Sequence, residues 1–263
     1  MTHKPVHTSS LLAGWNDLEE ELTAWAEAGR MADFWWRDDD AATNTAALRR
    51  LLDLAEGTPL ALAAIPAEAD AKLVSVLAPY SEIRILQHGW SHANHAPPEE
   101  KKCELGLHRP MEAVLMELSA GYARLMALFR TKFLPVLTPP WNRIDRSLLP
   151  LLPTVGFTGL STDKARPAAE PYPGLLQVNV HADLVDWRGG TGFVGEGRAL
   201  ALIVGHLEAR RLGRADAEEP TGILTHHLVQ DRATHDFLAR LVPLIQKHAA
   251  ARWLDLSRVF PRS

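Results

Sequence analysis

The sequence predicts an α/β fold in which about seven or eight parallel strands, alternating with helices, close into a complete or distorted barrel. Short apolar runs alternate with helical patterns along nearly the whole chain, which is typical of strands joined by crossover helices. Strands joined in this way run parallel, and helices must cover the faces of their sheet. A length of 263 residues is also common for barrels that form a single domain.

The expected elements follow from apolar periodicity and from the glycine and proline residues that interrupt it. The expected strands are 31–36, 60–65, 83–86, 133–137, 156–160, 175–180, 222–225 and 253–256. The expected helices are 16–28, 44–55, 67–77, 97–129 with a break near Pro110, 144–152, 195–212 and 234–251. We therefore expect a helical extension in residues 1–30, packed on a barrel domain of residues 31–263.

The composition is that of a soluble globular protein, with 46% hydrophobic and 23% charged residues. A net charge of −4 gives no reason to expect nucleic acid or an anionic membrane as a partner. No apolar run approaches the roughly 20 residues that span a bilayer. The single cysteine, Cys103, excludes an intrachain disulfide, and no leader pattern precedes the first helix, so we expect a cytoplasmic protein. The oligomeric state stays open, with a homo-oligomer among the alternatives.

Polar clusters occur where the expected strands end. They are 38–40, 88–92, 139–142, 183–187 and 226–227. In barrels of this kind the active site is built on the carboxyl ends of the strands, so clusters remote in sequence can converge there. This placement is the main reason to treat them as one site.

Two of these clusters supply the donors of a metal site. Asp39, His88 and His92 offer one carboxylate and two imidazoles and leave positions open for water and substrate, a pattern typical of catalytic zinc. His95 is a competing third imidazole, although Pro97 and Pro98 indicate a turn that carries it away. We expect one divalent ion, Zn²⁺, bound by the first three residues.

A carboxylate beside the metal is suited to act as a base, since the ion lowers the pKa of bound water. Asp38 is the candidate, with Asp40 as the alternative, although Asp40 could equally cap the following helix. His226 is expected to be the general acid in preference to His227. His181 could line the pocket or only cap a strand.

In this order the clusters resemble the motifs of the polysaccharide deacetylases, carbohydrate esterase family 4, over roughly residues 32–259. Five segments carry the resemblance: Trp36-Arg37-Asp38-Asp39-Asp40, His88-Gly89-Trp90-Ser91-His92, Thr138-Pro139-Pro140-Trp141-Asn142, Asp183-Leu184-Val185-Asp186-Trp187 and Gly222-Ile223-Leu224-Thr225-His226. The resemblance implies a distorted barrel of about seven strand–helix units, of the (β/α)7 type, that removes acetyl groups from sugars with a divalent metal. It also implies Asp38 as base, and Asp39, His88 and His92 as metal ligands.

The same resemblance assigns a substrate pocket. Its expected residues are Pro140, Trp141, Asn142, Asp183, Asp186, Trp187 and Leu224. The backbone N–H of Trp141 would stabilise the oxyanion, and Trp187 and Leu224 would wall the methyl pocket. The motifs also depart from the family pattern, because Thr138 stands where the family has an arginine that orients the base. Arg37 or Arg143 could supply that charge.

The expected function is therefore metal-dependent removal of an acetyl group from a saccharide or saccharide precursor, with N-acetyl favoured over O-acetyl. Two alternatives remain. One is hydrolysis of another non-peptide C–N bond, as in an amide or ureide. The other is a barrel that binds a glycan or a metal without catalysis, which the lost motif arginine favours.

Overall fold

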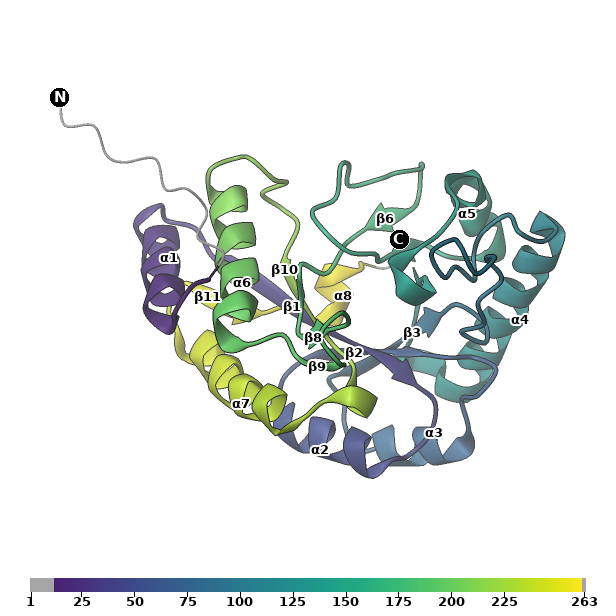
Figure 1. Cartoon of the computed structure of the whole chain (residues 1–263), viewed down its shortest axis with the longest axis horizontal. Helices are drawn as coiled ribbons and strands as arrows, with labels where there is room; N and C mark the ends of the chain where they lie inside the picture. The colour runs from purple at the N-terminus through teal and green to yellow at the C-terminus, as the bar shows by residue number, and fades with distance from the viewer. Residues whose placement is uncertain (1–11, 262–263) are drawn as a thin grey trace.

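The computed structural model describes residues 12–261 and shows a curved, parallel sheet with helices around its outside (Figure 1). Nine strands of the described residues form this sheet, in the order β6-β5-β4-β3-β2-β1-β10-β7, with β11 paired to the start of β1. The strands are β1 (Ala32–Ala41), β2 (Leu60–Ala64), β3 (Ile83–His88), β4 (Phe133–Thr138), β5 (Gly159–Leu160), β6 (Leu176–Gln177), β7 (Ala182–Asp183), β10 (Thr221–Thr225) and β11 (Ala251–Trp253). A separate antiparallel pair contains β8 (Val185–Asp186) and β9 (Gly192–Phe193).

Helices follow one another around the convex side of the sheet (Figure 1). The α-helices are α1 (Trp15–Glu27), α2 (Ala46–Leu54), α3 (Ala71–Leu77), α4 (Met111–Phe129), α5 (Leu152–Val155), α6 (Glu196–Arg211), α7 (Arg232–Lys247) and α8 (Leu256–Val259). Short 3-10 helices are η1 (Arg130–Lys132), η2 (Pro140–Asn142), η3 (Arg146–Leu151) and η4 (His227–Val229). No helix within 12–261 is both long enough and apolar enough to cross a membrane.

The segment from β6 to β7 joins the two edges of the sheet. On one side the N–H of Val178 donates to Leu160 O, and the N–H of Val180 to Thr162 O, each at 3.0 Å. On the other side the N–H of His181 donates to Gly222 O at 2.8 Å. One short stretch of chain therefore bonds to both ends, and the predicted α/β fold with a distorted barrel is confirmed.

Alternation along the strands divides the core into two parts. Trp35, Leu86 and Leu224 are buried in one apolar cluster, while Phe34 and Ile223 belong to the cluster that the strands share with the helices. Because successive side chains of a strand point to opposite faces, every second residue lies inside the barrel. Residues that continue the inner series past the strand ends therefore reach the barrel mouth.

Several expected elements differ in extent. Strand β1 continues through Asp38–Ala41, since Asp38 pairs with β10 and β2 and Ala41 pairs with β2. Only Met111–Phe129 of the expected 97–129 helix forms, after Pro110. Helix α1 packs its buried Trp15, Leu18, Leu22 and Trp25 into the same core as the barrel, and the division at residue 30 stays a prediction, with residues 1–11 outside the described part.

Candidate metal centre and active site

Strand β1 carries Arg37, Asp38, Asp39 and Asp40, and the local backbone sends them in different directions. Arg37 and Asp39 continue the inner series of Trp35, whereas Asp38 continues the outer series. A register shift lies between Asp38 and Ala41, and Asp40 has a φ of +70°. In a regular strand Asp40 would point to the outer face, as Asp38 does, but this bulge turns it toward the barrel mouth. Aspartate tolerates a left-handed backbone better than most residues.

Asp40, His88 and His92 form a group whose donor atoms all lie within 4.8 Å of one another. The Asp40 Oδ1 atom lies 3.2 Å from His88 Nε2 and 3.5 Å from His92 Nε2. The sequence-based assignment had Asp39 in this place. The carboxylate beside both imidazoles is instead that of Asp40, because of the bulge.

The group fits a divalent ion. His88 is buried, and its Nδ1 lies 2.9 Å from the carbonyl oxygen of Thr138, so Nδ1 carries the proton and the lone pair of Nε2 faces Asp40. Asp40 Oδ1 is buried and has no hydrogen-bond partner among the described residues. A buried oxygen of this kind is costly unless a cation satisfies it. Two imidazole nitrogens and a carboxylate oxygen are donors that zinc accepts.

Electrostatics at this group reflect closely spaced charges. Burial by itself would raise the pKa of Asp40, but the interaction with His88 in its protonated form, together with the charges of His226 and His92, holds it well below its ordinary value. Burial would lower the pKa of His88, yet the carboxylates of Asp39 and Asp40 outweigh it and raise that pKa. The pKa of His92 is lowered by burial and by His88. The cluster thus holds negative charge where a cation would bind.

The loop that carries His92 is fixed by a buried carboxylate. Glu104 is fully buried and accepts hydrogen bonds from the N–H groups of Trp90 at 3.2 Å and Ser91 at 2.8 Å. Gly89, between the two histidine ligands, has a φ of +56°. A Cβ there would lie 1.9 Å from Glu104 Oε2 and 2.7 Å from the Pro140 ring. This packing explains why glycine follows His88.

Gly89→Ala is expected to lower the free energy of unfolding by about 1–3 kcal/mol or more, because alanine would be strained at positive φ and would displace Glu104. Zinc affinity should fall as well, since His92 shares the loop. Gly205→Ala is the matched control: it lies in α6 with no atom near its added methyl group, and it should gain about 0.5–1 kcal/mol. Urea unfolding of both variants measures the difference. Equal stability of the two would contradict this account of Gly89.

Arg37 holds Asp39 at the barrel mouth. Its Nη2 donates to Asp39 Oδ2 at 3.0 Å, and its Nε lies 2.9 Å from Asp39 Oδ1, off the ideal hydrogen-bond direction. Nη1 donates to Ser161 Oγ and O, and Nη2 also to Asn142 Oδ1 at 2.7 Å. Arg37 is fully buried. Its charge therefore faces Asp39 and not the neighbouring Asp38, which the sequence-based assignment takes as the base.

Asp38 points away from the barrel mouth. It is fully buried, and its Oδ1 lies 2.5 Å from His227 Nδ1 while its Oδ2 accepts the hydroxyl of Thr225 at 2.6 Å. Burial would lower the pKa of His227, but the Asp38 carboxylate raises it. Both oxygens of Asp38 are thus engaged on the outer face of the sheet. The geometry favours a structural role for Asp38 and His227 rather than the predicted role of Asp38 as base.

His226 continues the inner series of Leu224 and lies beside Asp39, with His226 Nε2 3.9 Å from Asp39 Oδ2. Its ring and that of Trp187 are nearly perpendicular, with the centroids 4.8 Å apart, and its buried Nδ1 has no hydrogen-bond partner among the described residues. Asp183 accepts the indole N–H of Trp187 at 2.8 Å, so it orients this aromatic wall. Burial raises the pKa of Asp183, and the charge of His226 opposes that rise.

The β4 loop places Trp141 over the metal group. Trp141 and Asn142 have φ values of +55° and +56°, and the Trp141 ring lies 4.3 Å from that of His92. No described residue accepts a hydrogen bond from the Trp141 N–H, which leaves this donor for a ligand. Pro140 is buried against the Gly89 turn.

Other expected residues lie elsewhere. Asp186 accepts the N–H groups of Arg188 and Gly189 and closes an exposed turn. Leu224 is buried in the barrel interior. Arg143 donates to Lys102 O and does not contact Asp39. His95 is not among the three residues of the metal group, and its backbone N–H donates to Cys103 O.

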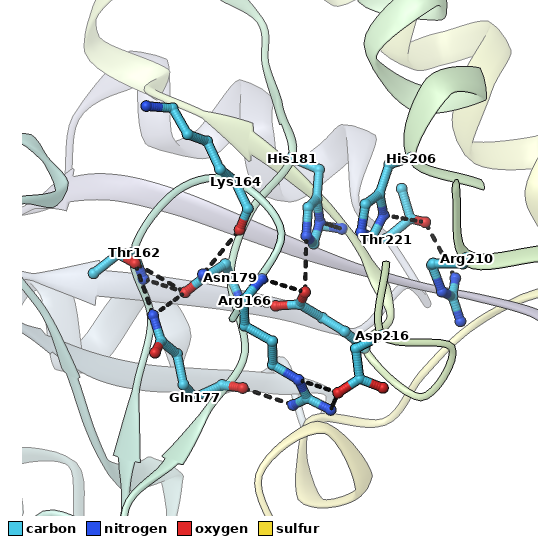
Figure 2. Close-up of polar contacts among 12 residues, drawn as sticks. Thr162, Lys164, Arg166, Gln177, Asn179, His181, His206, Arg210, Asp216 and Thr221 are labelled. Atoms are coloured by element: carbon cyan, nitrogen blue, oxygen red, sulfur yellow. Dashed lines mark hydrogen bonds and ion pairs between the residues drawn. The ribbon is translucent and has the colours of Figure 1, made fainter. Parts of the chain in front are cut away.

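A second cluster of donors contains His181, His206 and Glu219, near the starts of β7 and β10 (Figure 2). His181 Nδ1 accepts the N–H of Gly222 at 2.9 Å, so the single proton of its neutral ring is on Nε2. A metal on that Nε2 would require an imidazolate. Glu219 is held by the N–H groups of Arg166 and Asn179, 2.8 and 2.9 Å away. The cluster is a buried structural tie, which settles the open role of His181.

Arg210 is part of the same tie. The grouping of Arg210, Arg211 and Arg214 in the sequence predicts a solvated helix face, and for Arg210 this prediction is wrong. Its guanidinium is buried, donates to Asp33 O at 3.1 Å and to Thr221 Oγ1 at 3.2 Å, and lies 4.9 Å from the Trp25 ring centroid. The tie therefore joins α6, α1 and the lower end of β1.

No known family profile and no curated protein matches this sequence. Solved structures do. A Mycobacterium smegmatis protein assigned to the polysaccharide deacetylases aligns with a TM-score of 0.64 at 14% identity, over 95% of this chain and 92% of that one. The peptidoglycan N-acetylglucosamine deacetylase Bc1960 aligns with a TM-score of 0.55 at 17% identity, over 91% and 97%. The peptidoglycan deacetylase PdaC from Bacillus subtilis gives 0.53 at 10%, over 87% and 90%.

The chain has the polysaccharide deacetylase fold. Within this fold the site residues named above come from the ends of β1, β3, β4, β7 and β10. Sequence reasoning missed two buried supports of this site, Glu104 and Ser161. Neither follows a motif. A single glutamate inside an apolar-poor loop carries no signal that separates it from a solvent-exposed one.

Proposed function

We propose that this protein is a zinc-dependent deacetylase that hydrolyses an acetamido group on a saccharide. The observation that carries the proposal is the convergence of two separate devices at one barrel mouth. One is the group of Asp40, His88 and His92, and the other is the ion pair between Asp39 and Arg37. A barrel that only binds a ligand does not require a carboxylate positioned as a base next to a metal group. The deacetylase fold, seen in neighbours described as acting on peptidoglycan N-acetylglucosamine, supports the same reading.

We assign the metal ligands as Asp40, His88 and His92, with Asp39 as the base. A bound ion would polarise the amide carbonyl and lower the pKa of the attacking water. Asp39 takes the proton of that water as its oxygen adds to the carbonyl carbon. Arg37 orients Asp39 for this transfer, in the place of the missing arginine at Thr138.

Two further groups complete the reaction. The free N–H of Trp141 donates to the oxyanion, a contribution of roughly 3 kcal/mol per donor. His226 gives a proton to the nitrogen as the C–N bond breaks, so acetate and a free amine leave, and the proton taken by Asp39 balances the one that His226 gives. The exposed Trp187 forms one wall of the pocket, next to His226.

Acetate release from zinc-loaded protein tests this function. The panel contains N-acetylated monosaccharides, oligosaccharides and sugar nucleotides, and metal content is measured on the same preparation. We expect about one zinc ion per chain and acetate from at least one substrate. Zinc without acetate from any of these substrates, but with ring opening of a cyclic amide offered in parallel, would move the assignment to another C–N bond. Zinc without any turnover would favour a binding protein.

Zinc affinity is expected to depend on pH with a definite sign. The pKa of His88 is raised, and only the neutral imidazole binds metal, so each ion that binds displaces a proton. Affinity should therefore be full above the raised pKa and fall as the pH drops through it. Competition titrations against a chelator of known affinity, at neutral and at mildly acidic pH, measure this. An affinity that does not change with pH would contradict the assignment of His88 as a ligand.

A further inference from the structure

A large groove extends from the candidate active site across the ends of β4, β5 and β6. Its volume is about 760 Å³, and its lining residues lie within three segments, 142–150, 160–172 and 177–179, of which not every residue faces the groove. Pockets of this size hold ligands much larger than an acetamido group. The groove has an inner end at Asn142, which both lines it and accepts a hydrogen bond from Arg37. Two hydrogen bonds, Asn142 to Arg37 and Arg37 to Asp39, therefore connect this end of the groove with the proposed base.

The charge in this groove is positive. Arg146 and Lys164 line it, together with Arg143, whose guanidinium donates to Lys102 O, against one carboxylate, that of Asp163. The Lys164 ammonium lies 3.9 Å from Asp163, at the outer limit of an ion pair, and its side chain is 87% exposed. Neither arginine forms an ion pair with any residue in the described part of the chain. In a protein with a net charge of −4, the groove next to the site thus presents Arg146 without an ion-pair partner among the described residues and Lys164 with only a distant one.

The floor of the groove is rigid and neutral. Asn179 Oδ1 accepts hydrogen bonds from Thr162 and Gln177, and Asn179 Nδ2 donates to Lys164 O (Figure 2). This network fixes the backbone beneath Lys164, whose side chain points away from the bonded groups in Figure 2. The amides satisfy one another, so the charge for a ligand comes from the cations on the walls.

We propose that the groove binds the phosphoryl group of a phosphorylated acetamido sugar, an inference that rests on the proposed function. Guanidinium and ammonium groups recognise phosphate oxygens through charge-assisted hydrogen bonds. Tyr172, 37% exposed on the outer wall, offers a ring face on which a nucleobase can stack. The substrate class is therefore a sugar phosphate or a nucleoside diphosphate sugar.

Substrate preference tests the proposal. We compare kcat/KM for acetate release from N-acetylglucosamine, its 1-phosphate and its nucleoside diphosphate derivative. The ratio of kcat/KM for the phosphorylated substrate to kcat/KM for the neutral one should be at least about 10 in the wild type and should fall to about 1 in Arg146→Gln/Lys164→Gln. A ratio cancels any general loss of folded enzyme. Arg232→Gln, whose side chain is 94% exposed on α7, should leave it unchanged.

The outcomes separate this inference from the function. Turnover of neutral and phosphorylated sugars with equal kcat/KM, or an unchanged ratio in the double variant, would overturn the proposal that the groove binds phosphate. The deacetylase assignment would remain. If no substrate releases acetate, the function fails, and binding of uridine diphosphate to the zinc-loaded protein decides the groove: affinity lost in the double variant supports it, and affinity retained overturns it. A ratio that Tyr172→Ala lowers only for the nucleotide sugar identifies that member of the class.

Discussion

Asp39→Asn is expected to lower kcat by about 10²–10⁴-fold while zinc stays bound, because the variant loses the proton acceptor and keeps Asp40, His88 and His92. Arg37 would still find an oxygen of the amide at the same place. Acetate release and metal content on one preparation measure the two effects. Full activity in Asp39→Asn would remove the base assignment.

Asp38→Asn is the matched control for that experiment. The sequence-based assignment makes Asp38 the base, whereas the structure buries it against His227 and Thr225. Its loss should mainly destabilise the fold, by about 3–5 kcal/mol as for one partner of a buried pair, with kcat of the folded enzyme kept within a few-fold. The reverse result, a stable Asp38→Asn without turnover, would restore the original assignment.

His88→Ala is expected to abolish zinc binding and turnover together. His88 is the buried ligand whose tautomer is set by Thr138 O, and the two remaining donors would be left without an anchored third. The measurement is zinc content after dialysis against a chelator that leaves the wild type loaded. His95→Ala should keep its zinc, since His95 is outside the group; loss of zinc in that variant would point to the all-histidine alternative. The wild type should hold one ion rather than two, as the tautomer of His181 requires.

Much of the fold could be predicted from the sequence because alternating apolar runs and helical patterns specify a parallel sheet. The extents were less predictable. The expected helix at 97–129 was too long because the polar run 99–104 has helical composition, while burial of Glu104 beneath the Gly89 turn depends on contacts distant in sequence. Strand β1 was expected to end too early, since aspartates are rare in strands and only the partners of Asp38 explain it.

For the site, the residue types and strand ends were predictable, and the roles within the aspartate run were not. Side chains along β1 alternate between the inside and the outside of the barrel, which places Asp39 inside and Asp38 outside. This alternation could have been applied to the sequence from Trp35 onward. The bulge at Asp40 could not, because no glycine marks it. The same alternation places His226 inside the barrel and His227 outside, in line with the preference for His226. The catalytic role of His226 stays a proposal.

Arg37 and Asp39 stand two residues apart on the same strand. An arginine on the β4 loop would tie proton transfer to the conformation of that loop. Here strand β1 carries both partners, and the loop at 139–142 contributes only the amide of Asn142 to the pair. A change in this loop that keeps the Asn142 amide would therefore leave the Arg37–Asp39 pair with all its partners.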